Sequence, residues 1–265
     1  MIPDDLGGVP RRVPAISAHR GGSENGPGGT YRAYMQAATT GADYVEFDVR
    51  RTVDGTLVAW HDERAGWGRP VTTMSYSRLC ELAGQEVPQI AEVMRLLAGR
   101  AVAHIDLKDA RCAAAVARLG LELLGSAGMI VTTGDRAALA WMKRTFPAVP
   151  VGLTIAGGPA RAVRLSVPLL REPPWARADL GGAVRADWAV IRQRLARADE
   201  LARYRRQGLK TMVWTVNADR DLARWLATAD VDALVTDRPA RAIFLREQQL
   251  SGATANKRPA GPGRN

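Results

Sequence analysis

Cysteine is scarce in this chain of 265 residues, where Cys80 and Cys112 are the only two. Two cysteines cannot build a disulfide framework or a cysteine metal site, and such low usage is typical of a reducing compartment. Long apolar runs are also missing. No stretch approaches the roughly 20 residues of a membrane-spanning helix, and residues 1–15 lack the apolar segment of a secretory signal. We therefore expect a soluble, cytoplasmic protein without a transmembrane segment.

Three kinds of binding motif are absent as well. The sequence has no zinc-binding or RNA-binding motif, and no Gly-x-Gly-x-x-Gly follows the first predicted strand, which argues against a dinucleotide-binding fold. The formal charge is nevertheless +10, mainly because of scattered arginines such as Arg194, Arg197, Arg203, Arg205 and Arg206. Such scatter is usually a solvated surface, although a basic field also attracts anionic substrates. We expect no nucleic-acid partner and keep phosphate chemistry open.

The chain does contain a regular alternation of short apolar strands and helical segments. We predict eight strands, at residues 14–18, 44–49, 101–107, 129–132, 149–154, 186–191, 210–216 and 232–236. Helices are predicted between most of them, while residues 157–183, with Pro173-Pro174 and Gly181-Gly182, are predicted as loop. Polar groups concentrate where the strands end. This pattern favours an α/β fold of the TIM (β/α)8 barrel type, with a doubly wound sheet as the alternative.

One domain accounts for most of the length. We expect a loose leader over residues 1–13, a single barrel domain over residues 14–250 and a disordered tail over residues 251–265, since both ends are rich in Gly, Pro or polar residues. Between His61 and Pro88 lies a short insertion after the second strand, with a small helix near residues 75–82.

The second predicted strand carries paired carboxylates. At a period of two, Glu46 and Asp48 share one face with Tyr44, while apolar residues occupy the other face. After a turn at Asp54-Gly55, an extended run leads to His61 and Asp62. An acidic strand face is often only solvated surface, so the carboxylates alone leave the function open.

Two further strands bring similar chemistry. The first strand ends in His19-Arg20-Gly21-Gly22, and the third places His104, Asp106 and Lys108 on one face. In a barrel, side chains at the carboxyl ends of the strands meet at the catalytic face. The sequence thus predicts a shared site of carboxylates, cations and imidazoles.

In combination these motifs resemble the glycerophosphodiester phosphodiesterase family, whose fold is a TIM barrel. The resemblance spans residues 16 to about 239, and the motifs follow the family's order. They are His19-Arg20-Gly21, residues 41–49 (GADYVEFDV), Thr52 to Asp62 with its Asp54-Gly55 turn, residues 105–108 (IDLK), residues 213–217 (VWTVN) and residues 231–239 (VDALVTDRP).

The chain departs from the family pattern at three places. Glu24-Asn25 is separated from Thr30 by four residues, although the family usually has Glu-Asn-Thr. Asp106 stands where the family has glutamate, so a bound cation must sit closer or be reached through water. The insertion between His61 and Pro88 resembles a trimmed form of the family's lid.

Residues and resemblance together imply a mechanism. Glu46, Asp48 and Asp106 offer hard oxygen ligands for a divalent cation, Mg²⁺ or Ca²⁺. Arg20 and Lys108 are expected to bind the phosphoryl oxygens and to neutralise developing charge.

Proton transfer is assigned to imidazoles. His19 and His61 are expected to act as general base and general acid, because the unperturbed pKa of imidazole suits both tasks near neutral pH. Trp214 is either an apolar wall of the substrate site or a core aromatic. His104 is expected to be a hydrogen-bonded barrel residue.

The predicted partner is a small phosphodiester, hydrolysed to glycerol 3-phosphate and an alcohol. Two alternatives remain: the same site acting on a lysophospholipid or another phosphorylated metabolite, and a non-catalytic phosphate-binding barrel. The sequence leaves the oligomeric state unknown.

Overall fold

A closed barrel of parallel strands forms the centre of the molecule. The computed structural model describes residues 13–66, 68–156 and 186–255. Within these residues the barrel strands are β1 (Ala15–Ala18), β2 (Tyr44–Arg51), β6 (Val102–Leu107), β7 (Met129–Thr133), β8 (Val151–Ile155), β9 (Trp188–Arg192), β10 (Lys210–Trp214) and β11 (Ala233–Thr236). Each pairs with the next, and β1 pairs with both β2 and β11, which closes the ring. The barrel prediction is therefore confirmed, and the open sheet is excluded.

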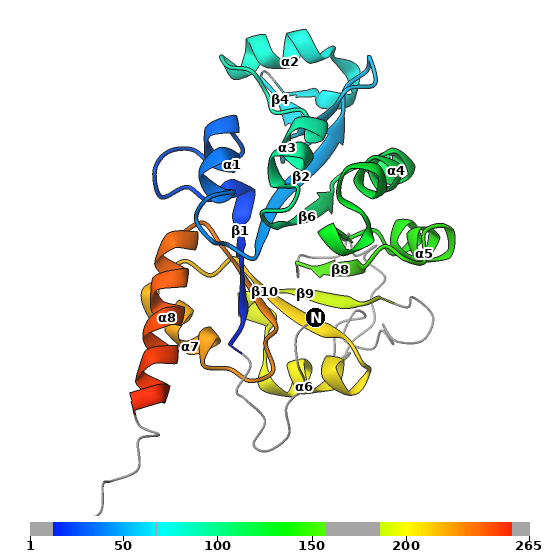
Figure 1. Ribbon diagram of the computed structural model, residues 1–265. Coiled ribbons are helices and arrows are strands. Elements are labelled where there is room, and N and C mark those ends of the chain that lie inside the picture. Colours follow the sequence, from blue (N-terminus) through cyan, green and yellow to red (C-terminus); the bar gives the residue numbers. More distant parts are fainter. Residues whose placement is uncertain (1–12, 67, 157–185, 256–265) are drawn as a thin grey trace, which may run out of the picture.

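Helices surround the barrel (Figure 1). They are α1 (Tyr31–Ala37), α3 (Ile90–Leu97), α4 (Ala113–Leu124), α5 (Arg136–Thr145), α6 (Ala198–Arg206), α7 (Asp219–Leu226) and α8 (Pro239–Ala255). Thr30 caps the start of α1, because its side-chain oxygen accepts from the Ala33 amide, 3.1 Å away. The loop predicted between β8 and β9 lies outside the described residues.

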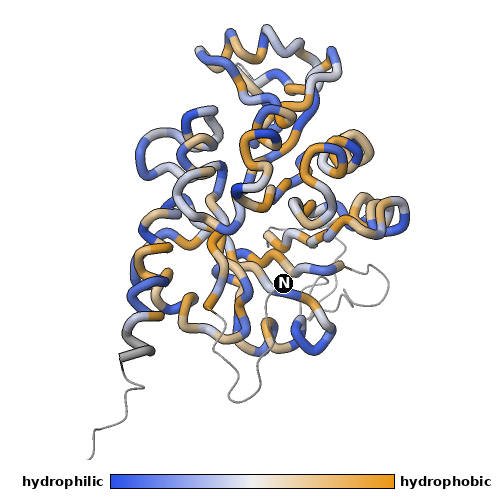
Figure 2. The backbone as a smooth tube through the Cα atoms, viewed as in Figure 1, coloured by the Kyte–Doolittle hydropathy of each residue, from blue (hydrophilic) through white to orange (hydrophobic). Residues whose placement is uncertain are grey.

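The period-2 pattern divides each strand between two environments. Val45, Phe47 and Val49 point outward and are fully buried beneath the helices, and the hydropathy colouring of Figure 2 shows apolar segments along strands and inner helix faces. The inward-facing residues include an apolar cluster and a group of ionisable side chains. Trp188, Met212 and their apolar neighbours fill the lower barrel, so the ionisable groups occupy the end where the strands terminate.

The predicted insertion after the second strand forms a small separate unit. It contains β3 (Leu57–Ala59), antiparallel to β2, the short pair β4 (Arg64–Ala65) and β5 (Arg69–Pro70), and α2 (Tyr76–Ala83). Its apolar side chains, including Val58, Met74 and Leu79, form a cluster separate from the main core. Figure 1 shows this unit projecting from one end of the barrel, beyond the end of β2.

The C-terminal boundary differs from the prediction. Helix α8 continues to Ala255, whereas the tail was expected to begin at residue 251. Extending an existing helix adds one hydrogen bond for each residue fixed, so a short alanine-containing segment such as SGATA can prolong it. Among the described helices, none is long and apolar enough to cross a membrane.

Candidate active site

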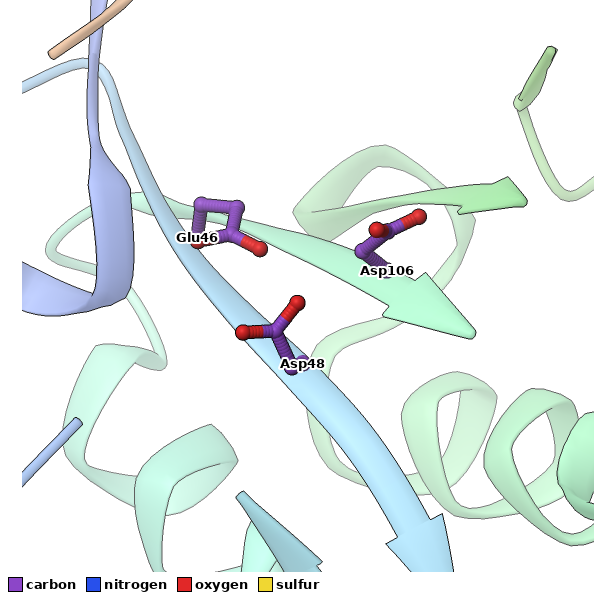
Figure 3. A group of neighbouring side chains, drawn as sticks. All are labelled: Glu46, Asp48 and Asp106. Atoms are coloured by element: carbon purple, nitrogen blue, oxygen red, sulfur yellow. The ribbon is translucent and has the colours of Figure 1, made fainter. Parts of the chain in front are cut away.

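Three buried carboxylates form the centre of the site. Glu46 and Asp48 project from β2, and Asp106 projects from β6, where it lies directly opposite Asp48 in the parallel register. The side chains converge from the two strands (Figure 3), and one oxygen from each lies within 4.8 Å of the others. Their exposed fractions are only 3–8%. Three buried negative charges this close require positive charge between or beside them.

Two cations of the protein supply part of that charge. The Lys108 ammonium lies 2.5 Å from Asp106 Oδ2 and 3.1 Å from Asp48 Oδ1. Burial alone would lower the pKa of Lys108, but Asp106 and Asp48 outweigh burial and raise it. Arg20 Nε lies 3.0 Å from Asp48 Oδ2, and the Arg20 amide donates to Glu46 Oε2 at 2.8 Å. Lys108 thus stays charged beside the cavity, and the Arg20 guanidinium lies on the other oxygen of Asp48.

These two cations do not fully offset the charge of the three carboxylates. Burial, followed by the charge of Asp48, raises the pKa of Glu46 from 4.5 to about 8. Asp48 Oδ2 is buried and accepts no well-aligned hydrogen bond, even though Arg20 Nε is near. A group of convergent carboxylate oxygens, one of them without a hydrogen bond, has the donor chemistry of a site for a hard divalent cation. The residues therefore fit a metal ion, and the shorter Asp106 side chain still reaches the cluster.

Neighbouring hydroxyl groups hold Asp106 in place. Thr132 Oγ1 donates to Asp106 Oδ1 at 2.9 Å, and Thr154 Oγ1 lies 3.3 Å from the same oxygen. His104 lies one layer lower, with Ser17 Oγ 3.1 Å from its Nδ1 and Thr132 Oγ1 3.2 Å from its Nε2. Burial lowers the pKa of His104 to about 4, so the ring is neutral. His104 is therefore buried and hydrogen-bonded, as predicted, and it also lines the cavity.

His19 stands at the end of β1, in a single 3₁₀ turn of residues His19–Gly21. Arg20 has a φ of 51°, and Gly21 has a φ of 78°. A β-carbon on Gly21 would lie 2.7 Å from the backbone carbonyl carbon of Ala33, so glycine is required there. This tight turn aims His19 and Arg20 into the barrel mouth.

The His19 imidazole is oriented by a carboxylate. Its Nδ1 lies 2.6 Å from Asp237 Oδ1, and Asn217 Nδ2 donates to Asp237 Oδ2 at 2.5 Å. Burial would lower the pKa of His19, but the hydrogen bond to Asp237 and the charges of Glu46 and Asp237 raise it above 6.5. The other ring nitrogen, Nε2, faces Glu46 Oε2 at 4.0 Å and the cavity.

His61 approaches from the insertion, just after β3. Its Nδ1 lies 2.7 Å from Asp62 Oδ1, and its carbonyl oxygen accepts from Arg50 Nε at 3.0 Å. The imidazole is 42% exposed and lines the same cavity as His19. Both imidazoles therefore have one nitrogen bound to a carboxylate and the other nitrogen available.

One cavity of about 180 Å³ joins these groups. All the residues singled out from the sequence for catalysis, substrate binding or metal binding line it: His19, Arg20, Glu46, Asp48, His61, Asp106, Lys108 and Trp214. Trp214 is half-buried and forms part of the wall, with its Nε1 donating to the Val190 carbonyl at 3.2 Å.

Several positioning residues were missed in the sequence. Asp237 and Asn217 lie in two motifs that carry the resemblance, and their places just after β11 and β10 were the available indication. Thr132 and Thr154 had no indication beyond their position at strand ends. Glu24 accepts from the amides of Ala240 and Arg241 at 3.0 and 3.1 Å, so it caps α8.

The fold and the cavity define an α/β-barrel enzyme with its site at the carboxyl ends of the strands. The sequence matches the Glycerophosphoryl diester phosphodiesterase family over residues 19–109 and 106–241. The chain belongs to this family of phosphodiester hydrolases.

A relative of similar length supports this membership. A glycerophosphodiester phosphodiesterase of Caldanaerobacter subterraneus subsp. tengcongensis is 25% identical over 254 residues, which cover 87% of this chain and 96% of that protein.

Solved structures share the fold. An Oleispira antarctica phosphodiesterase, described in complex with the product sn-glycerol-3-phosphate, has a TM-score of 0.73 at 19% identity, with 89% of this chain and 97% of that chain covered. A glycerophosphodiester phosphodiesterase from Thermotoga maritima has a TM-score of 0.69 at 21% identity, with 88% and 98% covered.

Proposed function

We propose that the protein hydrolyses a glycerophosphodiester to glycerol 3-phosphate and an alcohol, with a divalent cation, Mg²⁺ or Ca²⁺, held by Glu46, Asp48 and Asp106. The observation that carries the proposal is the convergence of this carboxylate cluster and two carboxylate-bound imidazoles on one cavity. The product described for the Oleispira antarctica phosphodiesterase is of the same class. When bound, the cation supplies Lewis acidity at a phosphoryl oxygen.

Substrate binding falls to Arg20 and Lys108. Both stand beside Asp48 and face the cavity, so their cationic groups can contact the remaining phosphoryl oxygens. They are already fixed by carboxylates before substrate arrives, which reduces the reorganisation needed as charge develops on phosphorus. Trp214 excludes water from one side of the same space.

The two histidines transfer protons. Phosphodiester cleavage needs one group that takes a proton from the attacking hydroxyl or water, and another that gives a proton to the leaving oxygen. His19 and His61 line the same cavity. The Nδ1 atom of His19 is hydrogen-bonded to Asp237, and the Nδ1 atom of His61 is hydrogen-bonded to Asp62. Each carboxylate selects the tautomer and stabilises the imidazolium that forms during turnover.

The test is a chelation and variant experiment. Hydrolysis of glycerophosphoinositol is measured after chelation and after return of Mg²⁺ or Ca²⁺, for the wild type, His19→Gln, His61→Gln and the surface control Arg118→Gln. We expect cation-dependent turnover that falls roughly 10²–10⁴-fold in either histidine variant, and the control to keep wild-type activity.

Other outcomes favour the alternatives. Turnover of lysophospholipids but not of glycerophosphodiesters would replace the substrate class with a lipid. Cation binding without turnover on either would favour a non-catalytic phosphate-binding barrel.

We also propose a cytoplasmic location, supported by the two thiols of Cys80 and Cys112, which are not joined in a disulfide. Fractionation of cells that express the full chain tests it, and recovery with an extracytoplasmic marker would contradict it.

A further inference from the structure

A second hollow adjoins the catalytic cavity. It measures about 800 Å³, and Trp214 and Thr215 line both spaces and so form their common wall. The hollow lies at the carboxyl ends of β9 and β10, on the same face of the barrel as the carboxylate cluster. A group attached to a phosphate in the catalytic cavity can therefore enter it past the Trp214 ring.

The hollow is lined by positive charge. Four arginines contribute to its wall, Arg192, Arg194, Arg197 and Arg224, against the single acidic residue Asp199. These arginines come from three separate segments: the end of β9, the connection into α6, and α7. Two that appear merely scattered in the sequence, Arg194 and Arg197, are thus gathered at one place.

Two of the guanidinium groups rest on aromatic rings. Arg192 lies over Trp214, with 5.9 Å from its central carbon to the ring centroid, and Arg224 lies over Trp225 at 4.8 Å. Stacking holds a guanidinium plane while leaving its edge N–H groups available. Those donors match carboxylate or phosphate oxygens, which they bind in pairs.

The catalytic cavity also needs additional space. Sites for small molecules commonly measure about 300–1,000 Å³, whereas this cavity measures about 180 Å³. It is too small for a whole diester with a bulky alcohol portion, so part of that portion must extend outside it. The adjoining hollow offers the volume, and its charge favours an anion over a cation such as choline.

From this geometry, and resting on the proposed function, we propose that the arginine-lined hollow is a subsite for a second anionic group, a phosphate or carboxylate, on the alcohol portion of the glycerophosphodiester. The preferred substrate is then a diester with two separate anionic groups. The cation-bearing glycerophosphocholine is a poor one.

The test compares glycerophosphoinositol with glycerophosphoinositol 4-phosphate, two soluble diesters that differ only by the second phosphate. For the wild type we expect kcat/KM to be roughly tenfold higher for the phosphorylated probe, the size given by one or two charge-assisted hydrogen bonds at a partly exposed site. The gain should lie mainly in KM, because the hollow is removed from the reacting phosphorus. It should shrink as salt is added.

The variants assign the effect to the hollow. In Arg192→Gln/Arg224→Gln we expect the ratio of the two kcat/KM values to fall to near one, with turnover of unphosphorylated glycerophosphoinositol retained. The control Arg118→Gln changes an exposed arginine on α4 and should keep the wild-type ratio.

Each other result is decisive. Equal kcat/KM for both probes in the wild type, with clear turnover, overturns the subsite and leaves the phosphodiesterase proposal intact. No turnover on any diester overturns both. If both probes are used equally and the arginine variants instead lose binding to phosphatidylserine vesicles, the hollow is a membrane contact and the subsite is overturned.

Discussion

At the scale of single residues, His104 is the side chain whose environment has the clearest consequence for stability. It is buried between Ser17 and Thr132, and burial lowers the pKa of its ring from 6.5 to about 4. In the unfolded chain the same imidazole takes up a proton near its ordinary pKa. The folded state therefore holds a neutral histidine over a pH range in which the unfolded state is charged.

This difference predicts the pH dependence of unfolding. Because the folded pKa is depressed, the contribution of His104 is present above pH 6.5 and is lost as pH falls toward 4. At pH 5 the loss relative to pH 7 is about 2 kcal/mol. Urea unfolding in chelator, compared between the wild type and His104→Gln, should show a smaller loss from pH 7 to pH 5 in the variant. An equal loss in both proteins would show that His104 is not buried and neutral.

Some site residues could be predicted from the sequence, whereas their partners across the barrel could not. Glu46, Asp48, Asp106 and Lys108 follow from strand periodicity, since alternate residues of a strand share a face. His19 and Arg20 follow instead from their position directly after the first strand. Asp237 could not be paired with His19 in this way, because the two are 218 positions apart and meet only when β11 closes the barrel against β1. Which side chains meet across the barrel depends on the register between strands. The residue pattern within one strand does not specify that register.

At the scale of elements, the insertion between β2 and α3 carries part of the site on a separate core. Leu79 of α2 is fully buried in the insertion's own apolar cluster, together with Val58 and Val71. His61 lies just after β3, where this unit joins the barrel. Packing within the insertion therefore determines where one of the two imidazoles sits.

Weakening this small core should affect catalysis before it affects the barrel. Leu79→Ala removes a fully buried side chain and should cost about 2–5 kcal/mol of local stability. We expect faster amide hydrogen exchange in residues 53–87 and lower turnover, with little change in the melting temperature of the barrel.

A matched substitution separates local from global loosening. Leu139→Ala changes an equally buried leucine on α5, in the main core. It should lower the melting temperature of the whole barrel without selective exchange in the insertion. If Leu79→Ala lowered the global melting temperature as much as Leu139→Ala, the insertion would be part of one cooperative unit.

Element boundaries were less predictable than element types. The segments that follow β6 and β9 first form 3₁₀ turns, at Ala110–Cys112 and Gln193–Leu195, and the α-helices α4 and α6 start only at Ala113 and Ala198. Asp109 explains the first case, because its carboxylate accepts from the Arg111 amide at 3.0 Å and tightens the start. Apolar periodicity locates the buried face of a helix, while local side-chain contacts decide where it begins.

At the scale of the whole molecule, the carboxylate cluster links cation binding to global stability. Glu46 and Asp48 on β2 and Asp106 on β6 repel one another inside the barrel. The raised pKa of Glu46, about 8 against 4.5, means that stability present below pH 4.5 is increasingly lost as pH rises toward 8. At pH 7 the barrel without a cation therefore carries an electrostatic cost that a cation would remove.

This linkage predicts that an added cation raises the melting temperature of the wild type, and that Glu46→Gln raises the melting temperature without a cation. For the wild type, Mg²⁺ or Ca²⁺ at about 100 times its dissociation constant should add about 2.7 kcal/mol, or roughly 5–10 °C in melting temperature for a chain of this size. Glu46→Gln replaces a carboxyl group that must hold a proton in the folded state at pH 7, so it should melt higher than the wild type in chelator and gain little from added cation. Glu122→Gln, on the exposed side of α4, should keep the wild-type gain. Scanning calorimetry at fixed pH and salt measures all three proteins. A full cation-induced gain in Glu46→Gln would place the ion elsewhere and leave the buried carboxylates without the role inferred for them.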